Sequence, residues 1–478
     1  MARDASPETL TPDLCVIGAG SGGLSVAAGA AQMGASVVLC EGGEMGGDCL
    51  NYGCVPSKAL IAAAHRAQAM REAAPFGVAP GAGAADWAGV KAHVRAVIDG
   101  IAPHDSQERF EGLGVRVVRD WARFASPREV EAGGLRIRAR RFVIATGSRP
   151  AVPPIPGLAE APHLTNETVF SAPDFPRRLI VLGGGPIGVE LAQAFRRLGA
   201  EVALVEGAQV LGREDREAAE VVTARLRAEG VEIHEGAAAE RVSHGDAGVS
   251  LALAGGAAVT GSHLLVALGR RVDLSRLAPE AGGVETDAKG VRTDAGLRSV
   301  SNRRVYAVGD AAGGLQFTHL AGYHAGLVVR SALFRLPVKA RADHVPRVTY
   351  ADPELAQVGP TEAEARAAGL RFETVRFPYA ENDRARAERA TEGFAKILIG
   401  RGGRVLGATV VGAQAGELIG LWALAVSKRL KVGDVAGMVA PYPTLGEVSK
   451  RAAGAYYAPR LFDNPLVKKA VRLLAKFG

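Results

Sequence analysis

Long apolar runs are missing from this chain of 478 residues: no stretch of 18 consecutive apolar residues occurs, which excludes a membrane-spanning helix. Cysteine is also scarce, with 4 in the whole sequence, so the disulfide framework of small secreted proteins is excluded. The N-terminus carries Arg3, Asp4 and Glu8 but no apolar segment, which is not the pattern of a signal peptide. Together these absences predict a cytoplasmic protein.

Blocks of lysine and arginine are absent too, although the net charge is +7 and the pI is about 9.3. Because basic and acidic residues are interspersed, we expect a mildly basic, solvated surface and no nucleic-acid partner. Hydrophobic residues make up 48% of the chain and charged residues 22%, which is ordinary for a globular protein. The length favours roughly two to four domains.

Two of the cysteines stand close together in a glycine-rich stretch. Cys49 and Cys54 have four residues between them, and Pro56 then begins an Ala-rich run over residues 58–71. Proline favours the first turn of a helix, so Cys54 is predicted to lie near a helix N-terminus. The free N–H groups and the helix dipole there stabilise a thiolate. The spacing also allows the two thiols to close a short, reducible disulfide.

Two other interpretations of this cysteine pair are a zinc site and inert buried thiols. A zinc site needs four ligands, and no second cysteine pair or histidine cluster stands at ligand spacing. Inert burial suits Cys15 and Cys40 better, because each lies inside an apolar run and resembles a small core residue. A reactive pair is therefore the favoured interpretation of Cys49 and Cys54.

A dinucleotide-binding pattern lies near the N-terminus. An apolar strand at residues 14–17 precedes a glycine-rich turn, a helical stretch and a second strand at residues 37–40. In this pattern the glycines allow a tight turn, approach to a pyrophosphate and close helix packing, while the acid accepts from a ribose hydroxyl. The residues in these roles are Gly18, Gly20, Gly23 and Glu41.

The same pattern returns in the middle of the chain, with Gly183, Gly185, Gly188 and Glu206. The first glycine and the acid are 23 positions apart in both copies. A repeat in register predicts two dinucleotide sites, and a duplicated fold with one empty site is the alternative. The Glu206 carboxylate repels a 2′-phosphate, so NADH is favoured over NADPH. Arg213 and Arg216 follow soon after and would soften that preference.

Residues 46–58, together with both fingerprints, resemble the FAD-dependent pyridine nucleotide-disulfide oxidoreductases. This family includes dihydrolipoamide dehydrogenase, glutathione reductase and mercuric reductase. Asp48 stands where the family usually has threonine. The resemblance implies an α/β fold with two Rossmann-like domains, which bind FAD and NAD, and a C-terminal α+β dimerisation domain. The implied boundaries are 1–150 with 275–340 for FAD, 151–274 for NAD, 341–455 for the homodimer interface, and 456–478 for an amphipathic tail.

The resemblance also implies roles for individual residues. Cys54 would lie against the flavin, and Cys49 would be the interchange thiol that meets the acceptor. Lys58 and Glu190 resemble the pair beside the reactive flavin nitrogen. FAD contacts are implied at Ala122, Ala145, Thr146, Gly147, Ser148 and Asp310, and an NAD contact at Gly269. In the homodimer, Tyr442 and Glu447 of one subunit would line the acceptor side of the other.

One departure from the family concerns the acid/base. Tyr442 occupies the position where dihydrolipoamide dehydrogenase and glutathione reductase have histidine, and the last histidine of the sequence is His344. A phenol titrates near pH 10 and an imidazole near 6.5, so tyrosine is a poor base for a thiol. Tyrosine here resembles mercuric reductase. However, the C-terminal cysteine pair and the N-terminal metal-capture module of that enzyme have no counterpart in this sequence.

The sequence therefore predicts an enzyme that passes electrons from NADH through FAD to a Cys49–Cys54 disulfide. The expected final acceptor is a small disulfide or dithiol, or a metal ion. Two alternatives remain: an oxidase or quinone reductase that does not use the cysteines, and a sensor subunit with little turnover. The tail has apolar residues opposite lysines and arginines. We expect it to pack on its own protein rather than to contact a membrane.

Overall fold

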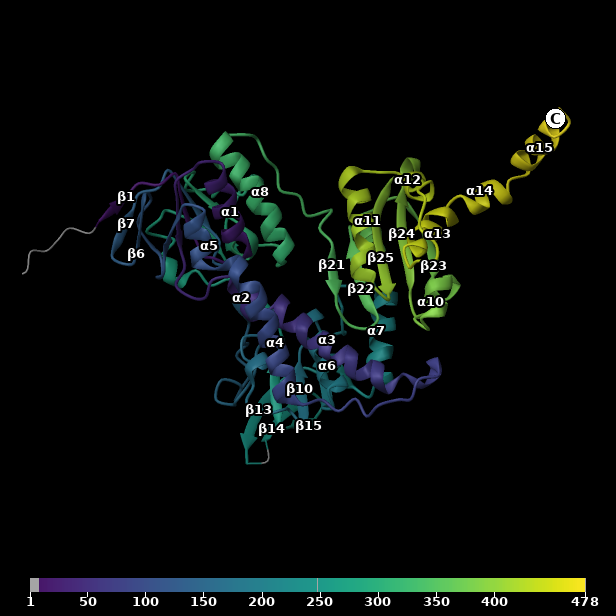
Figure 1. Cartoon of the computed structure of the whole chain (residues 1–478), viewed down its shortest axis with the longest axis horizontal. Coiled ribbons are helices and arrows are strands. Elements are labelled where there is room, and N and C mark those ends of the chain that lie inside the picture. The colour runs from purple at the N-terminus through teal and green to yellow at the C-terminus, as the bar shows by residue number, and fades with distance from the viewer. Residues whose placement is uncertain (1–7, 247, 478) are drawn as a thin grey trace, which may run out of the picture.

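The computed structural model describes residues 8–246 and 248–477, so most of the expectation about the N-terminus lies outside the described residues. Three main sheets organise the chain (Figure 1). The first is wholly parallel in the order β20-β8-β2-β3-β4. Its strands are β2 (Leu14–Ile17), β3 (Val37–Cys40), β4 (Val115–Val118), β8 (Arg141–Ile144) and β20 (Val305–Ala307).

The first sheet is covered on both faces because its strands are apolar on both sides. Leu14 and Val16 pack toward helices α1 (Ser21–Gln32) and α8 (Thr318–Phe334). Cys15 and Ile17 point the other way, into a core shared with a smaller sheet. That sheet contains β1 (Thr9–Leu10), β5 (Arg123–Ser126), β6 (Glu129–Ala132) and β7 (Leu135–Ile137). Cys15 and Cys40 are buried in this core, as expected.

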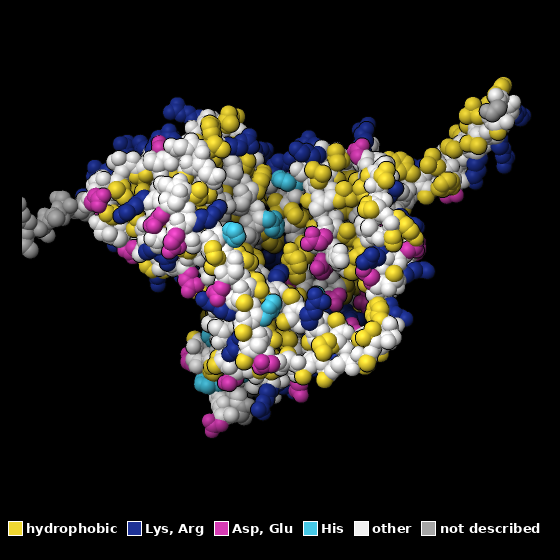
Figure 2. All heavy atoms as spheres, in the orientation of Figure 1, with side chains coloured by type: hydrophobic (Ala, Val, Ile, Leu, Met, Phe, Trp, Pro, Cys, Tyr) yellow, Lys and Arg dark blue, Asp and Glu magenta, His cyan; other side chains and the backbone are white. Residues whose placement is uncertain are grey.

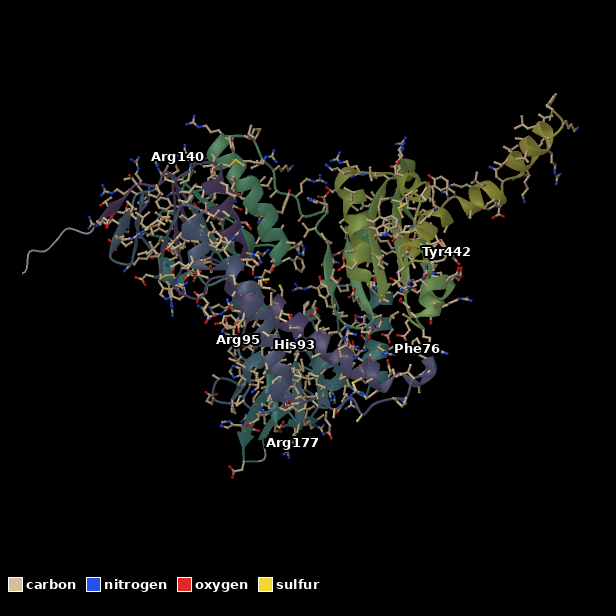
Figure 3. The ribbon with its side chains drawn as sticks, viewed as in Figure 1. Phe76, His93, Arg95, Arg140, Arg177 and Tyr442 are labelled. Atoms are coloured by element: carbon tan, nitrogen blue, oxygen red, sulfur yellow. The ribbon has the colours of Figure 1, made fainter. Side chains whose placement is uncertain are left out.

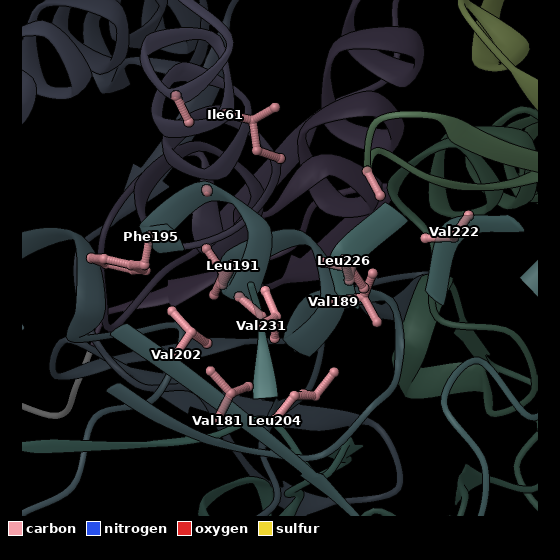
Figure 4. Packing of buried hydrophobic residues seen from close by; sticks show 14 of the residues in the cluster. Ile61, Val181, Val189, Leu191, Phe195, Val202, Leu204, Val222, Leu226 and Val231 are labelled. Atoms are coloured by element: carbon pink, nitrogen blue, oxygen red, sulfur yellow. The ribbon is translucent and has the colours of Figure 1, made fainter. Parts of the chain in front are cut away.

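The second sheet is also parallel, in the order β12-β11-β10-β16. Helix α6 packs against it, and α3 from the first half of the chain packs over α6 (Figure 4), while α4 packs on α3 and contacts α6 through Trp87 and Phe195. A three-stranded sheet, β13-β14-β15, covers its other face. The strands are β10 (Arg178–Leu182), β11 (Glu201–Glu206), β12 (Glu232–Glu235), β13 (Ala239–Gly245), β14 (Gly248–Leu253), β15 (Ala258–Gly261) and β16 (His263–Val266). The helices are α3 (Cys54–Arg71), α4 (Trp87–Ile101), α6 (Pro186–Arg197) and α7 (Arg216–Ala228).

The third sheet is antiparallel, in the order β21-β22-β25-β24-β23, and packs on α11 and α13. Its strands are β21 (Arg347–Thr349), β22 (Glu354–Val358), β23 (Phe372–Pro378), β24 (Phe394–Gly400) and β25 (Val405–Gly412), and the helices are α11 (Ala415–Lys428) and α13 (Glu447–Ala455). Two parallel α/β sheets followed by an α+β unit confirm the predicted fold class. Beyond α13, the short helices α14 (Ala458–Phe462) and α15 (Pro465–Leu474) lead away from the body (Figure 1).

Candidate functional site

A cavity of about 990 Å³ brings together residues that are far apart in the sequence. The first glycine turn, the cysteine stretch, α6 and the residues around β21 all contribute to its wall. Most of the residues singled out from the sequence line it: Gly18, Gly20, Glu41, Cys49, Cys54, Lys58, Ala122, Ala145, Thr146, Gly147, Ser148, Glu190, Gly269 and Asp310. Gly23, Gly183, Gly185, Gly188, Glu206, Tyr442 and Glu447 are not part of this wall.

The two cysteines belong to consecutive helices at this cavity. Cys49 lies on the short helix α2 (Gly47–Asn51), and Cys54 is the first residue of α3, so the predicted helix start is confirmed. Both are free thiols in the structure. The Cys54 sulfur lies 3.3 Å from the Thr318 hydroxyl. A hydrogen bond from Cys49, aided by Thr318 and the charge of Lys58, lowers the pKa of Cys54 to about 6 although burial opposes this, while the pKa of Cys49 is raised.

Lys58 is held one helical turn beyond Cys54 by two contacts. Its ammonium lies 2.8 Å from the Glu190 carboxylate, which is only 7% exposed, and 4.3 Å from the centre of the Tyr350 ring. The second oxygen of Glu190 accepts a hydrogen bond from the Tyr350 backbone N–H at 2.9 Å. The cation is therefore fixed at the cavity wall by residues from α6 and from the end of β21.

The sequence repeat is also a repeat in three dimensions. The Glu41 carboxylate accepts from the N–H groups of Ala19 and Gly43, at 2.5 and 2.6 Å. The Glu206 carboxylate accepts from Gly184 and Ala208 in the same way, at 2.8 and 2.9 Å. Each carboxylate oxygen has a second lone pair left for a ribose hydroxyl.

The third glycine of each fingerprint acts through packing. A Cβ atom at Gly23 would lie 1.8 Å from the Gly18 carbonyl oxygen, and one at Gly188 would lie 1.9 Å from the Gly183 oxygen. Any side chain at either position would push the helix off its strand. This explains why Gly23 and Gly188 do not line the cavity although the fingerprint requires them.

The residues around the first fingerprint fit FAD. Gly20 and Gly47 face each other so closely that a Cβ atom on Gly47 would lie 2.7 Å from the Gly20 Cα, and the bare backbone at this point suits the approach of a pyrophosphate. Asp310 accepts a hydrogen bond from the Ser148 hydroxyl at 2.5 Å, and burial raises the pKa of this aspartate. A carboxylate beside a hydroxyl in a cleft suits the ribityl hydroxyls of a flavin.

Sequence reasoning missed an ion pair at the first cysteine. Asp48 lies 3.1 Å from the Arg270 guanidinium and accepts a hydrogen bond from the Asn166 amide at 3.0 Å. Arg270 also donates to the hydroxyl and the carbonyl oxygen of Ser148, both at 2.8 Å. The one signal for this pair in the sequence was the departure from threonine at position 48.

Tyr442, which is labelled in Figure 3, and Glu447, the first residue of α13, do not line the cavity of their own chain. The Tyr442 side chain is 68% exposed, and its hydroxyl donates to Asp383 at 3.1 Å, which raises the pKa of the phenol. One buried oxygen of Glu447 has no hydrogen-bond partner among the described residues. Asp383 was not predicted from the sequence, because no motif marks it.

Comparison with known proteins places this geometry in a family. The family model described as pyridine nucleotide-disulphide oxidoreductase matches residues 12–325, and the model of its dimerisation domain matches residues 345–453. The chain belongs to the pyridine nucleotide-disulphide oxidoreductases. Members of this family carry FAD and use a pyridine nucleotide, so this oxidoreductase is an FAD-dependent NAD(P)H enzyme. Its dimerisation domain supports a homodimer.

Several named members are similar to this oxidoreductase. Mercuric reductase from Acidithiobacillus ferrooxidans is 36% identical over 92% of the chain and 82% of its own length. Dihydrolipoyl dehydrogenase from Bacillus subtilis is 34% identical over 92% and 95%. Among solved structures, the Cu(II) complex of the HOCl-induced flavoprotein disulfide reductase RclA from Escherichia coli has a TM-score of 0.81 at 28% identity, over 92% of this chain and 98% of that chain. LpdA from Mycobacterium tuberculosis has a TM-score of 0.85 at 27% identity, over 93% and 99%.

Proposed function

We propose that this oxidoreductase uses NADH to reduce a Cys49–Cys54 disulfide, and that the dithiol then reduces a thiophilic metal ion. The observation that carries the proposal is the Cys54 thiol at the start of α3, in one cavity with the Lys58–Glu190 pair and the first glycine turn. FAD, which the residues around the first fingerprint would hold, would supply the transfer of two electrons from the nicotinamide to the disulfide. One Hg(II) ion, or two Cu(II) ions, then takes these two electrons from the dithiol to give Hg(0) or two Cu(I), the Cys49 proton is released, and the disulfide forms again.

Cys54, Cys49 and Lys58 have different roles because their charges differ in the reduced protein. Cys54 holds the negative charge of the reduced pair because the Cys49 hydrogen bond, Thr318 and Lys58 stabilise its thiolate. Cys49 keeps the proton, since its pKa is raised, and it is the thiol that meets the acceptor. Lys58 supplies a fixed positive charge where negative charge develops during reduction.

We propose a metal ion as the electron acceptor because tyrosine replaces the histidine base at position 442. Exchange with a disulfide requires Cys49 to lose its proton to a base. Tyr442 from the partner subunit would be a poor base, because Asp383 raises the pKa of its phenol further and the phenol therefore stays protonated near neutral pH. A soft metal ion displaces a thiol proton directly when it binds. The similarity to mercuric reductases and to a Cu(II) complex of RclA supports Hg(II) or Cu(II) as the first ions to test.

An anaerobic titration with NADH tests the electron path. We expect a long-wavelength thiolate-to-flavin absorbance after two electrons, followed by oxidation on addition of Hg(II) or Cu(II). Slow oxidation by lipoamide or glutathione disulfide would support a metal acceptor. Direct bleaching of the flavin without this absorbance would refute the cysteine pathway and favour an oxidase or quinone reductase.

Dihydrolipoamide should be a poor substrate. Because Tyr442 replaces a histidine base, we expect turnover at least about tenfold below that of the Bacillus subtilis dihydrolipoyl dehydrogenase assayed in parallel. Tyr442→His should raise this turnover, whereas Tyr442→Phe should leave it low. Equal turnover of the two wild-type enzymes would contradict the proposed role of position 442.

The thiolate absorbance should depend on pH with a midpoint near the pKa of Cys54, about 6. Because this pKa is lowered, the thiolate is present above the midpoint and is lost as the pH falls through it. Near pH 7 about ten molecules carry the thiolate for each one that carries the thiol. The measurement is a pH titration of the two-electron-reduced protein.

Thr318 and Ser57 provide a matched comparison for that titration. Thr318→Val removes the hydroxyl 3.3 Å from the Cys54 sulfur and should move the midpoint upward. Ser57→Ala removes a hydroxyl that donates to the Cys54 carbonyl oxygen instead, at 3.2 Å, and should leave the midpoint in place. Equal shifts in both variants would show that Thr318 does not act on the sulfur.

A further inference from the structure

The C-terminal segment, residues 458–477, contains the helices α14 and α15 and extends away from the rest of the subunit (Figure 1). The N-terminus of helix α15 is capped, because the Asn464 side chain accepts a hydrogen bond from the Leu466 N–H at 2.9 Å. Pro465 occupies the first turn of the helix. Contacts link α15 to α14 and α14 to α13. Arg460 on α14 still pairs with Glu373 on β23 at 2.6 Å, and α15 then extends beyond the third sheet.

The two faces of α15 differ sharply in character. At 100° per residue, the basic side chains occupy about one third of the helix circumference and the large apolar ones the opposite side. Figure 2 shows the two kinds of side chain along different edges of the tail. The basic residues of α15 are Lys468, Lys469 and Arg472, and its exposed apolar residues are Leu466, Val471, Leu473 and Leu474; Lys476 and the exposed Phe477 follow the end of the helix.

The subunit itself does not cover the apolar face. Leu474 is 67% exposed and Phe477 is 80% exposed, and Phe462 on α14 is 70% exposed. The sequence-based expectation that this tail packs on its own protein is therefore not met within the subunit. An exposed apolar stripe of this kind marks an interaction surface.

Charge decides which occupant fits. No aspartate or glutamate follows Asp463, so α15 and the residues after it present only positive charge beside the apolar stripe. Two tails packed against each other would bring their lysines and arginines close together, whereas a nucleic acid would leave the apolar stripe in water. A bilayer with anionic lipids satisfies both faces, because head groups attract the cations and acyl chains take up the apolar side chains.

We propose that α14 and α15 form an amphipathic anchor that docks the oxidoreductase on anionic membrane surfaces. Among the described helices, none is long and apolar enough to cross a membrane, so the contact is peripheral. A homodimer carries two such tails, and simultaneous engagement of both strengthens docking well beyond that of one. This inference does not depend on the identity of the electron acceptor.

Vesicle sedimentation of the full-length holoenzyme tests the anchor. We expect the protein to bind at least about tenfold more strongly to phosphatidylcholine vesicles that contain about 30% phosphatidylglycerol than to pure phosphatidylcholine vesicles. Binding to the anionic vesicles should weaken as the salt concentration rises. The double variant Leu474→Glu/Phe477→Glu should lose binding about tenfold or more. Lys468→Glu/Lys469→Glu should do the same, while NADH oxidation with a soluble acceptor stays unchanged.

The matched control reverses the charge of two lysines that lie outside the tail. Lys289 and Lys339 are exposed lysines on the body of the subunit, so Lys289→Glu/Lys339→Glu should retain most binding. Failure of the wild-type protein to sediment with anionic vesicles would overturn the proposal. Dissociation of the dimer by Leu474→Glu/Phe477→Glu in analytical ultracentrifugation would also overturn it, because the tail would then belong to a contact between two copies.

Discussion

Cys54→Ser should abolish the long-wavelength absorbance of the two-electron-reduced protein and lower metal-ion reduction by on the order of a thousandfold. A serine hydroxyl neither forms a disulfide with Cys49 nor ionises near neutral pH. The side chain lies at the start of α3 and at the cavity wall, where the thiolate is stabilised. Anaerobic NADH titration followed by absorbance, together with steady-state turnover, measures both effects.

Cys49→Ser separates the roles of the two thiols. Cys54 then has no disulfide partner, so its thiolate should be present even before NADH is added, although turnover is lost. Cys40→Ala serves as the control, because Cys40 is buried in the core of the first sheet, away from the cavity. Full turnover of Cys54→Ser would refute the disulfide pathway and select the oxidase or quinone reductase alternative.

The parts of this fold that were predictable are those encoded locally. Short apolar runs predicted β2 and β3, and they form these strands because both faces of the first sheet are buried. The helix start at Cys54 followed from Pro56 and the glycines, which act on their immediate neighbours. The two dinucleotide-binding turns could be predicted for the same reason, because in each of them the glycine turn and its acid form one local unit.

What escaped prediction depends on residues distant in the sequence. Tyr350 reaches Lys58 only because the turn after β21 packs against α6. Arg270, in the short strand β17 (Arg270–Arg271), pairs with Asp48 of helix α2 because these two distant elements meet at the cavity. Helix α2 is only five residues long, too short for a periodic pattern, and its entry relies on positive φ angles at Gly46 and Gly47. No local pattern carries these contacts.

Glu206→Ala should reverse much of the nicotinamide preference that we propose. The Glu206 carboxylate sits at the end of β11, 2.8 Å from the Gly184 N–H, and would repel the 2′-phosphate of NADPH. A like-charge contact costs several kcal/mol, so we expect the ratio of kcat/KM for NADH to that for NADPH to fall by on the order of a hundredfold or more. Arg213 lines the cavity and would favour the phosphate once the carboxylate is gone.

The comparison that isolates this effect is Glu201→Ala, which removes a carboxylate from the opposite, exposed end of the same strand. That variant should keep the wild-type ratio. Loss of the hydrogen bonds from Gly184 and Ala208 also weakens the turn, so thermal unfolding is measured beside kinetics to separate stability from specificity. An unchanged ratio in a folded Glu206→Ala protein would show that the nicotinamide is selected elsewhere, and Arg213 and Arg216 would then be the residues to replace next.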